Sequence, residues 1–244
     1  KVSRPFCVDY PAPQSGCGFL QTFVCMGKES QLRLWETYGG SATAQRPDAP
    51  APALWVTACF DATLGQGAQL ERYVFQSWSP STYAFHLEES HLGEQARLYT
   101  LHVHTGSRYS RFENSVYLEG AQAHAQLRTL NLVQAGQVFD QRSFQSHKAP
   151  HTTSDLLYKN ALWAHASTIF SGLIQVEPRA QFTDAYQTNR YLLLHPTAQA
   201  HSLPGLQIEA NPVKCSHGAT NSAVDPQALY YLQSRGLPAS EAQN

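Results

Sequence analysis

The segment Gly120-Ala-Gln-Ala-His-Ala-Gln-Leu-Arg-Thr-Leu-Asn-Leu-Val133 joins a turn of small residues to a run of alternating apolar and polar residues. A period of two is the signature of a β-strand with one buried face. Similar segments recur from about residue 54, each after Gly or a small polar turn, and helical periodicity is nearly absent. They span residues 67–75, 97–104, 168–176 and 205–210, and a further strand is predicted at 31–36. The chain is therefore predicted to be all-β.

A short sequence motif precedes several of these predicted strands: a small residue, a polar residue and then the first apolar residue of the strand. It occurs at Ala68-Gln69-Leu70, Ala180-Gln181-Phe182 and Ala198-Gln199-Ala200, at unequal spacing. Variable spacing fits the turns of a parallel β-solenoid, in which the small residue lies at the corner and the apolar residue points inward. An antiparallel β-sandwich is the competing fold, because its short strands and turns produce a similar pattern.

Composition excludes several functional classes. The chain has 244 residues, with 17 Lys and Arg against 18 Asp and Glu, and a formal net charge of −1. A nucleic-acid binder needs clustered cations, which this balance argues against. The 11 Phe, 12 Tyr and 4 Trp argue against disorder, because so much apolar surface must be buried. The 22 Gln suit stacked strands, in which equivalent side chains form ladders.

The chain is predicted to contain three parts. Residues 1–53 are expected to form an irregular N-terminal segment, because Pro, Gly and Ala dominate 11–18 and 42–53. Residues 54–224 form the β-helix core. Residues 225–244 begin a C-terminal helical region, in which Asp225-Pro226 supplies the N-cap and first position and Gly236 ends the helix. A second helix is expected to begin at 237–242.

The sequence predicts a cytoplasmic chain. It contains no apolar run near the roughly 20 residues that a spanning helix needs, and Lys1-Val-Ser-Arg-Pro5 lacks the apolar region of a signal peptide. An odd and uneven set of five cysteines is unlike a secreted disulfide framework. Cys7, Cys17 and Cys25 are expected to be small buried hydrophobic side chains. The other two are Cys59 and Cys215.

Two polar clusters are expected to be structural. Residues 147–154, His-Lys-Ala-Pro-His-Thr-Thr-Ser, hold two histidines four apart, but Pro150 excludes the helix that would aim both at one metal. A hydrogen-bonded turn is the simpler interpretation. Residues 184–190, Asp-Ala-Tyr-Gln-Thr-Asn-Arg, are expected to cap turns between rungs of the solenoid.

A third cluster, Lys214-Cys-Ser-His-Gly-Ala-Thr220, has a pattern with chemical potential. Cys215 and His217 lie at i and i+2, so on an extended strand both point to one face, within reach of one metal ion. Lys214 is expected to lower the thiol pKa modestly, and Gly218 to let another backbone approach. Two ligands do not complete a tetrahedral site, so a metal role and an inert role both stay open. The sequence has neither the nucleophile elbow of a serine hydrolase nor a phosphate-binding loop.

From residue 119 to 242 the chain resembles the SufB/SufD family of iron–sulfur cluster assembly proteins, and SufD more closely. The motifs Cys-Ser-His-Gly-Ala-Thr at 215–220 and Leu-Gln-Ser-Arg-Gly at 232–236 are together highly specific for this family. The resemblance is carried by residues 147–154, 158–160, 170–176, 180–194, 204–210, 213–220 and 230–236.

The resemblance implies a right-handed parallel β-helix that forms part of a longer protein. It also implies a subunit of the SUF complex, without enzymatic activity of its own, that partners a SufB-type scaffold and the SufC ATPase in cluster assembly and iron acquisition. The alternative is a SufB-like or homodimeric structural scaffold without cluster ligands of its own. A metal-dependent enzyme is a third hypothesis, which needs His147 or His151 to approach His217.

The resemblance also implies roles for particular residues. His217 matches a histidine that SufD uses at its interface with SufB, and Cys215 is the neighbouring candidate thiolate for iron or a transient iron–sulfur cluster. SufB receives sulfur on a cysteine aligned with residues 187–190, where this sequence has none, and this favours SufD. Tyr230 and Arg235 would lie on the helix that docks the ATPase, and flavin binding is left open.

Overall fold

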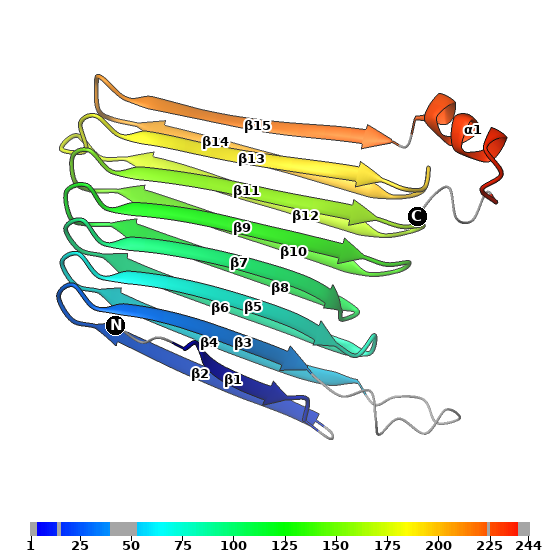
Figure 1. The fold of residues 1–244 in the computed structure, drawn as a ribbon, viewed down its shortest axis with the longest axis horizontal. Helices are drawn as coiled ribbons and strands as arrows, with labels where there is room; N and C mark the ends of the chain where they lie inside the picture. Colours follow the sequence, from blue (N-terminus) through cyan, green and yellow to red (C-terminus); the bar gives the residue numbers. More distant parts are fainter. Residues whose placement is uncertain (1–3, 14–15, 40–52, 224, 239–244) are drawn as a thin grey trace.

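The structure, a computed structural model, describes residues 4–13, 16–39, 53–223 and 225–238. The chain winds into a parallel β-solenoid of about 7 turns, in which each turn gives one strand to each of two sheets (Figure 1). One sheet consists of β1 (Phe6–Pro11), β3 (Gln31–Gly39), β5 (Gln69–Trp78), β7 (Arg97–Gly106), β9 (His124–Val133), β11 (Thr153–Leu162), β13 (Asp184–Leu193) and β15 (Lys214–Ala223). The other consists of β2 (Gly16–Met26), β4 (Leu54–Leu64), β6 (Thr82–Leu92), β8 (Tyr109–Leu118), β10 (Val138–His147), β12 (Ser167–Val176) and β14 (Gln199–Ile208).

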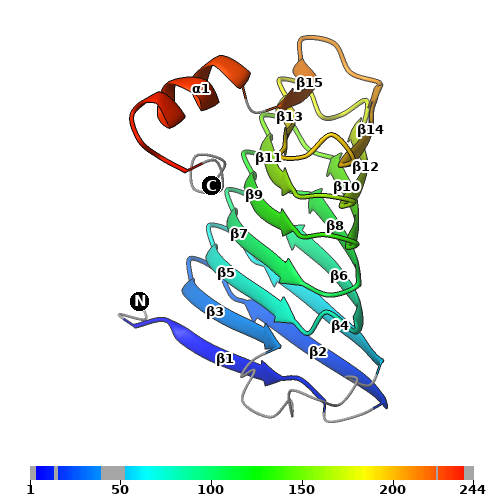
Figure 2. The same ribbon diagram turned by 90° about the vertical axis from the view of Figure 1, so that its right-hand side faces the viewer.

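Strand pairing confirms the β-helix and rejects the sandwich. Each strand pairs in parallel with the strand two positions along the chain, so that Leu127, Leu156 and Gln187 align across β9, β11 and β13. The two sheets face each other across the interior (Figure 2). Alternate residues point inward because the side-chain period of a strand is two. The inward set includes Phe60, Phe112 and Phe170, all of which are fully buried.

The turns that lead into the odd-numbered strands stack on one another through a shared backbone geometry. Gln95, Gln122 and His151 all have φ between 55° and 59°. The backbone N–H of each donates to a carbonyl of the next turn, as Gln122 does to Pro150 at 3.1 Å. The side chains of Gln95 and Gln122 also bond to each other at 3.1 Å, which confirms a glutamine ladder at this corner.

The motif of a small residue, a polar residue and an apolar strand correctly marks the start of a strand at two of its three occurrences. Ala68 and Ala198 are buried directly before β5 and β14. The prediction is wrong at the third, because Phe182 does not start a strand: it lies in a turn with φ of 61° and its side chain is exposed.

The prediction of an irregular segment over residues 1–53 is wrong for its described parts. They contain β1, β2 and β3, and the strand predicted at 31–36 is confirmed as part of β3. These strands extend the sheets of the core without interruption, since β3 pairs with β5 and β2 with β4. The Ala- and Pro-rich stretch from 42 to 52 lies outside the described residues.

Two expectations about burial are also wrong. Cys7, Cys17 and Cys25 are exposed thiols on the outer strands, where alternation turns them away from the interior. Aromatic side chains are not all buried either, since Phe19 on β2 is 81% exposed. Others stack in ladders on the outer faces, such as Trp55 and Tyr83 with ring centroids 4.7 Å apart.

Helix α1 (Pro226–Ser234) follows β15 and lies beside that end of the solenoid (Figure 1). The side chain of Asp225 accepts a hydrogen bond from Gln227 N at 2.9 Å, Pro226 occupies the first turn, and Gly236 follows with φ of 97°. The predicted helix signals are therefore confirmed. The second helix expected at 237–242 lies mostly outside the described residues, and among those described no helix is long and apolar enough to span a membrane.

Candidate functional site

The solenoid is open at the end formed by β14 and β15. Among the described residues, β14 pairs only with β12 and β15 only with β13, so the outer edge of each strand presents free backbone groups. Apolar side chains are exposed at the same end, with Leu203 at 61% and Ile208 at 41%. An uncovered edge with apolar side chains is the geometry that strand pairing or a docked partner completes.

Cys215 and His217 both lie on β15 at this end. In register, Cys215 aligns with Ala185 and His217 with Gln187, both inward-facing residues of β13. The Cys215 side chain is half-buried and packs against the apolar cluster that contains Ile174. The His217 side chain is exposed at the open end. The structure therefore places both donors on one face of the last strand, as their spacing predicts.

The thiol of Cys215 is less acidic than predicted. Burial raises its pKa, the nearby Asp184 carboxylate adds to this, and a backbone hydrogen bond from Ala185 opposes it. The prediction that Lys214 lowers the thiol pKa is therefore wrong. A thiol with a raised pKa stays protonated at neutral pH, so binding a metal here would release a proton. A Cβ on Gly218 would meet nothing within 4 Å, so no described segment packs on that side of the glycine beyond its pairing with β13.

Cys215 and His217 do not form a complete metal centre with the other residues that the structure describes. Among the described residues, no group of three or more His, Cys, Asp or Glu side chains is arranged to hold a metal ion. A tetrahedral iron or zinc site needs four donors. Any further ligands at this end would have to come from outside the described residues.

His147 is occupied by structural hydrogen bonds. It ends β10, is fully buried, and bonds through Nδ1 to Thr152 Oγ1 at 2.8 Å and through Nε2 to Ser154 Oγ at 2.9 Å. Burial lowers its pKa to about 4. His151 stacks on Phe182 with ring centroids 4.8 Å apart. The hydrogen-bonded turn is therefore confirmed, and among the described residues neither ring joins His217 in a group of three that could hold the metal of a metal-dependent enzyme.

The predicted turn caps at 184–190 are strand residues instead, because all of them belong to β13. Gln187 and Asn189 share the inward parity of Ala185 and are buried. Gln187 Oε1 accepts hydrogen bonds from Ser143 Oγ and Gln145 Nε2, each at 3.3 Å. This polar interior explains why the segment lacks the apolar alternation of a typical strand.

A buried ionic cluster, missed by the sequence analysis, lies further inside the solenoid. The Arg72 guanidinium contacts the carboxylate of Glu36 and donates to Glu88 Oε1 at 2.5 Å, and all three side chains are buried. Burial opposes ionisation of Glu88, but Arg72, His102 and His86 outweigh it and hold its pKa well below the usual range. The cluster therefore keeps its carboxylate charged in the interior.

Three histidines adjoin this cluster. His86 Nε2 lies 3.1 Å and His102 Nε2 lies 3.4 Å from the Glu88 carboxylate. Burial is the main cause that lowers the pKa of His102 well below normal and that of His104 to about 3. The inward position of two of these histidines could have been inferred from the strand predicted at 97–104. His102 and His104 lie an even number of residues from Leu98, so they point to the same face of the strand as Leu98 does.

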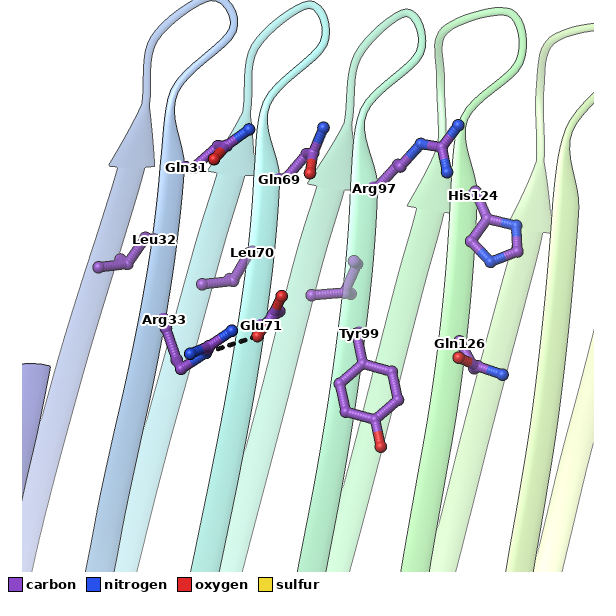
Figure 3. A pocket seen from close by; sticks show the side chains of 11 residues that line it. Gln31, Leu32, Arg33, Gln69, Leu70, Glu71, Arg97, Tyr99, His124 and Gln126 are labelled. Atoms are coloured by element: carbon purple, nitrogen blue, oxygen red, sulfur yellow. Dashed lines mark hydrogen bonds and ion pairs between the residues drawn. The ribbon is translucent and has the colours of Figure 1, made fainter. Parts of the chain in front are cut away.

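A shallow groove crosses the outer face of the odd-numbered sheet (Figure 3). Its walls include the exposed ion pair between Arg33 and Glu71, whose Nε and Oε2 lie 2.6 Å apart. Burial and then the charge of Arg97 lower the pKa of His124. These side chains stack as ladders on successive strands and do not converge on one point, so the groove holds no assembled chemistry. It is lined by Gln31, Leu32, Arg33, Gln69, Leu70, Glu71, Arg97, Leu98, Tyr99, His124 and Gln126.

Helix α1 presents an exposed aromatic surface. Tyr230 is 72% exposed and Tyr231 is 60% exposed. Of the predicted docking residues, Tyr230 lies in the middle of α1 and Arg235 is its C-cap residue. The Arg235 guanidinium lies 5.8 Å from the centroid of the Tyr231 ring.

Comparison with known proteins places the chain in a family. The family described as "SUF system FeS cluster assembly, SufBD core domain" matches residues 11–244. An iron–sulfur cluster assembly SufBD family protein of Synechocystis sp. is 29% identical over 223 residues, which are 91% of this chain and 49% of the relative. The iron–sulfur cluster assembly protein SufD of Escherichia coli is 30% identical over 186 residues, 76% of this chain and 44% of the relative. A SufBD family protein of Mycobacterium tuberculosis is 30% identical over 183 residues, 72% of this chain and 46% of the relative. The chain thus spans about half the length of these relatives.

Proposed function

Since this chain belongs to the SufBD core domain family of the SUF system for iron–sulfur cluster assembly, we propose that it is part of a SufD-like subunit, with no catalytic activity of its own. In this proposal the open end at β14 and β15 pairs with a SufB-type scaffold in the cytoplasm, and a SufC-type ATPase docks on α1. A nascent iron–sulfur cluster is the cargo at the junction.

The observation that carries the proposal is the placement of Cys215 and His217 on the last strand of an uncovered solenoid end. Thiolate and neutral imidazole are donors that iron accepts. Two donors on one partner and the remainder on another would form a cluster site only when the subunits meet. Such a shared site makes assembly of the complex a condition for binding the cargo.

Co-purification tests the partnership. Tagged full-length protein is expected to retain a SufB-type and a SufC-type protein. Tyr230→Ala with Arg235→Ala is expected to lose the ATPase and keep the SufB-type subunit, because these side chains belong to α1 and its C-cap and not to the open-edge strands β14 and β15. Recovery of this chain only as its own dimer would support the alternative of a homodimeric structural scaffold.

Complementation tests His217. In a strain that depends on the SUF system, His217→Ala is expected to abolish growth while the protein still accumulates. His201→Ala is the matched control, since His201 lies on β14 at the same end with an exposed side chain. Growth of the His217→Ala strain at the wild-type rate would show that His217 is not part of the functional site.

Anaerobic reconstitution with iron and sulfide tests Cys215 in the complex. The charge-transfer absorbance near ~400 nm is expected to fall in Cys215→Ala. It is expected to be unchanged in Cys25→Ala, which removes an exposed thiol from β2 at the opposite end. Identical spectra for both variants and the wild type would favour a purely structural role for this end.

A further inference from the structure

The interior of the solenoid contains buried side chains with polar atoms that have no partner among the described residues. Each of these side chains is at least nine-tenths buried and occupies an inward position on its strand. The atoms include Arg72 Nη2, Gln76 Oε1, Thr100 Oγ1, His102 Nδ1, Gln141 Oε1, Gln145 Oε1, Gln187 Nε2 and Asn189 Oδ1.

These atoms form a column along the solenoid axis. The first four belong to β5 and β7, and the last four to β10 and β13. A bonded set bridges the two groups: Asn131 Nδ2 and Gln141 Nε2 both donate to Asn160 Oδ1, each at 2.8 Å. Buried polar side chains are therefore present on every odd-numbered strand from β5, which carries Arg72, to β13, where Gln187 aligns with His217 at the open end. In the register of Thr100 and Gln187 itself, the intervening positions are the apolar Leu127 and Leu156.

The column cannot stay unpaired. An unsatisfied buried donor or acceptor costs free energy, and a set of this size would together cost about as much as the whole stability of a domain. Apolar side chains at these positions would remove that cost, yet the strands place amides, an imidazole and a guanidinium there. The missing partners must therefore be supplied by something small enough to enter a packed core.

The mixture of donors and acceptors identifies the partner. Arg72 Nη2 and Gln187 Nε2 can only donate, whereas Gln76 Oε1 and Gln145 Oε1 can only accept. An anion would satisfy only the donors and a cation only the acceptors, while water does both. We propose that the interior of the solenoid from β5 to β13 binds a column of ordered water molecules, ending at Gln187 beneath the rung of His217.

Water at Gln187 can be observed directly in the full chain. In ¹⁵N-labelled protein, the side-chain amide protons of Gln187 are expected to show cross-peaks to water with the sign of a long-lived contact. A crystal structure is expected to place a water within hydrogen-bonding distance of Gln187 Nε2 and Gln145 Oε1. Both results would be contradicted by a rotated Gln187 amide that pairs with a protein oxygen and shows no contact to water.

Substitution provides an independent readout. Gln187→Leu keeps the approximate volume and is expected to lose at least one long-lived water in ¹⁷O magnetic relaxation dispersion. Ile174→Val is the matched control, because Ile174 is an equally buried but apolar residue of the neighbouring β12. An unchanged number of long-lived waters in Gln187→Leu would overturn the proposal. If that variant does not fold, the cross-peaks of the wild-type protein still decide the question.

Discussion

Gly172 on β12 faces the end of the Gln187 side chain across the interior. A Cβ at this position would lie 2.5 Å from Gln187 Oε1 and 2.6 Å from Phe170 Cζ. Gly172→Ala therefore has to displace the Gln187 amide and break its bonds with Ser143 and Gln145. Because those partners are buried, we expect the free energy of unfolding to fall by roughly 1–3 kcal/mol, measured by urea denaturation.

Gly218→Ala is the matched control for this substitution. Gly218 lies on β15 and a Cβ there meets nothing within 4 Å. An alanine in a strand restricts the unfolded chain more than glycine does, so this variant should be unchanged or more stable by about 0.5–1 kcal/mol. Equal stability losses at both glycines would show that the backbone, and not the Gln187 amide, requires glycine at 172.

Buried histidines make the stability depend on pH. The pKa of His147 is lowered to about 4 and that of His104 to about 3, mainly by burial, against about 6.5 in an unfolded chain. The unfolded state therefore binds protons that the folded state rejects. Their contribution to stability is complete above pH 6.5 and is lost as the pH falls from 6.5 toward 4 for His147 and toward 3 for His104.

This pH dependence is measurable in one comparison. Between pH 7 and pH 5 the wild-type protein should lose free energy of unfolding, and His147→Gln should lose less, by up to roughly 2 kcal/mol. Urea denaturation at the two pH values gives the difference directly. A loss in His147→Gln as large as that of the wild type would mean that His147 is protonated in the folded state.

At the scale of elements, the turn ladder depends on one backbone conformation. Gln122 has φ of 59°, a left-handed region that glycine tolerates and a β-branched residue does not. Gln122→Gly and Gln122→Val both lose the side-chain bond to Gln95, so that loss cancels in the comparison. We expect Gln122→Val to be less stable than Gln122→Gly by about 1–3 kcal/mol in thermal unfolding, and equal stabilities would contradict the role assigned to φ.

At the same scale, strands whose alternation starts from an apolar residue could be predicted from the sequence, even where part of their inward face is polar. β5, β7, β9 and β12 match predicted strands because apolar residues such as Leu70, Leu98 and Leu127 mark their inward face, although β7 also places Thr100, His102 and His104 inward. β13 was predicted as turn caps because Gln187 and Asn189 occupy inward positions where the pattern expects apolar side chains. The placement of Cys215 and His217 on one face followed from their spacing, but the raised thiol pKa depends on packing by other strands, which spacing cannot reveal.

At the scale of the whole molecule, stability should be lowest at the two ends of the solenoid. Each turn of a solenoid contacts only its neighbours, so the terminal turns lose half of their contacts. Exposure follows this rule, since β2 and β14 carry exposed or half-buried residues on both faces while β8 and β12 are buried on their inward face. Amide hydrogen exchange should therefore be fast in 16–26 and 199–223 and slow in 109–176.

Adding the proposed SufB-type partner should change this profile at one end only. If the partner pairs with the open edge, amides of 199–223 become protected because β14 and β15 gain neighbours, while 16–26 continue to exchange fast. The opposite end thus serves as an internal control within one experiment, read by mass spectrometry of peptides from the complex and from the free chain. Protection confined to 16–26 would place the interface at β1 and β2 and would separate Cys215 and His217 from the partner.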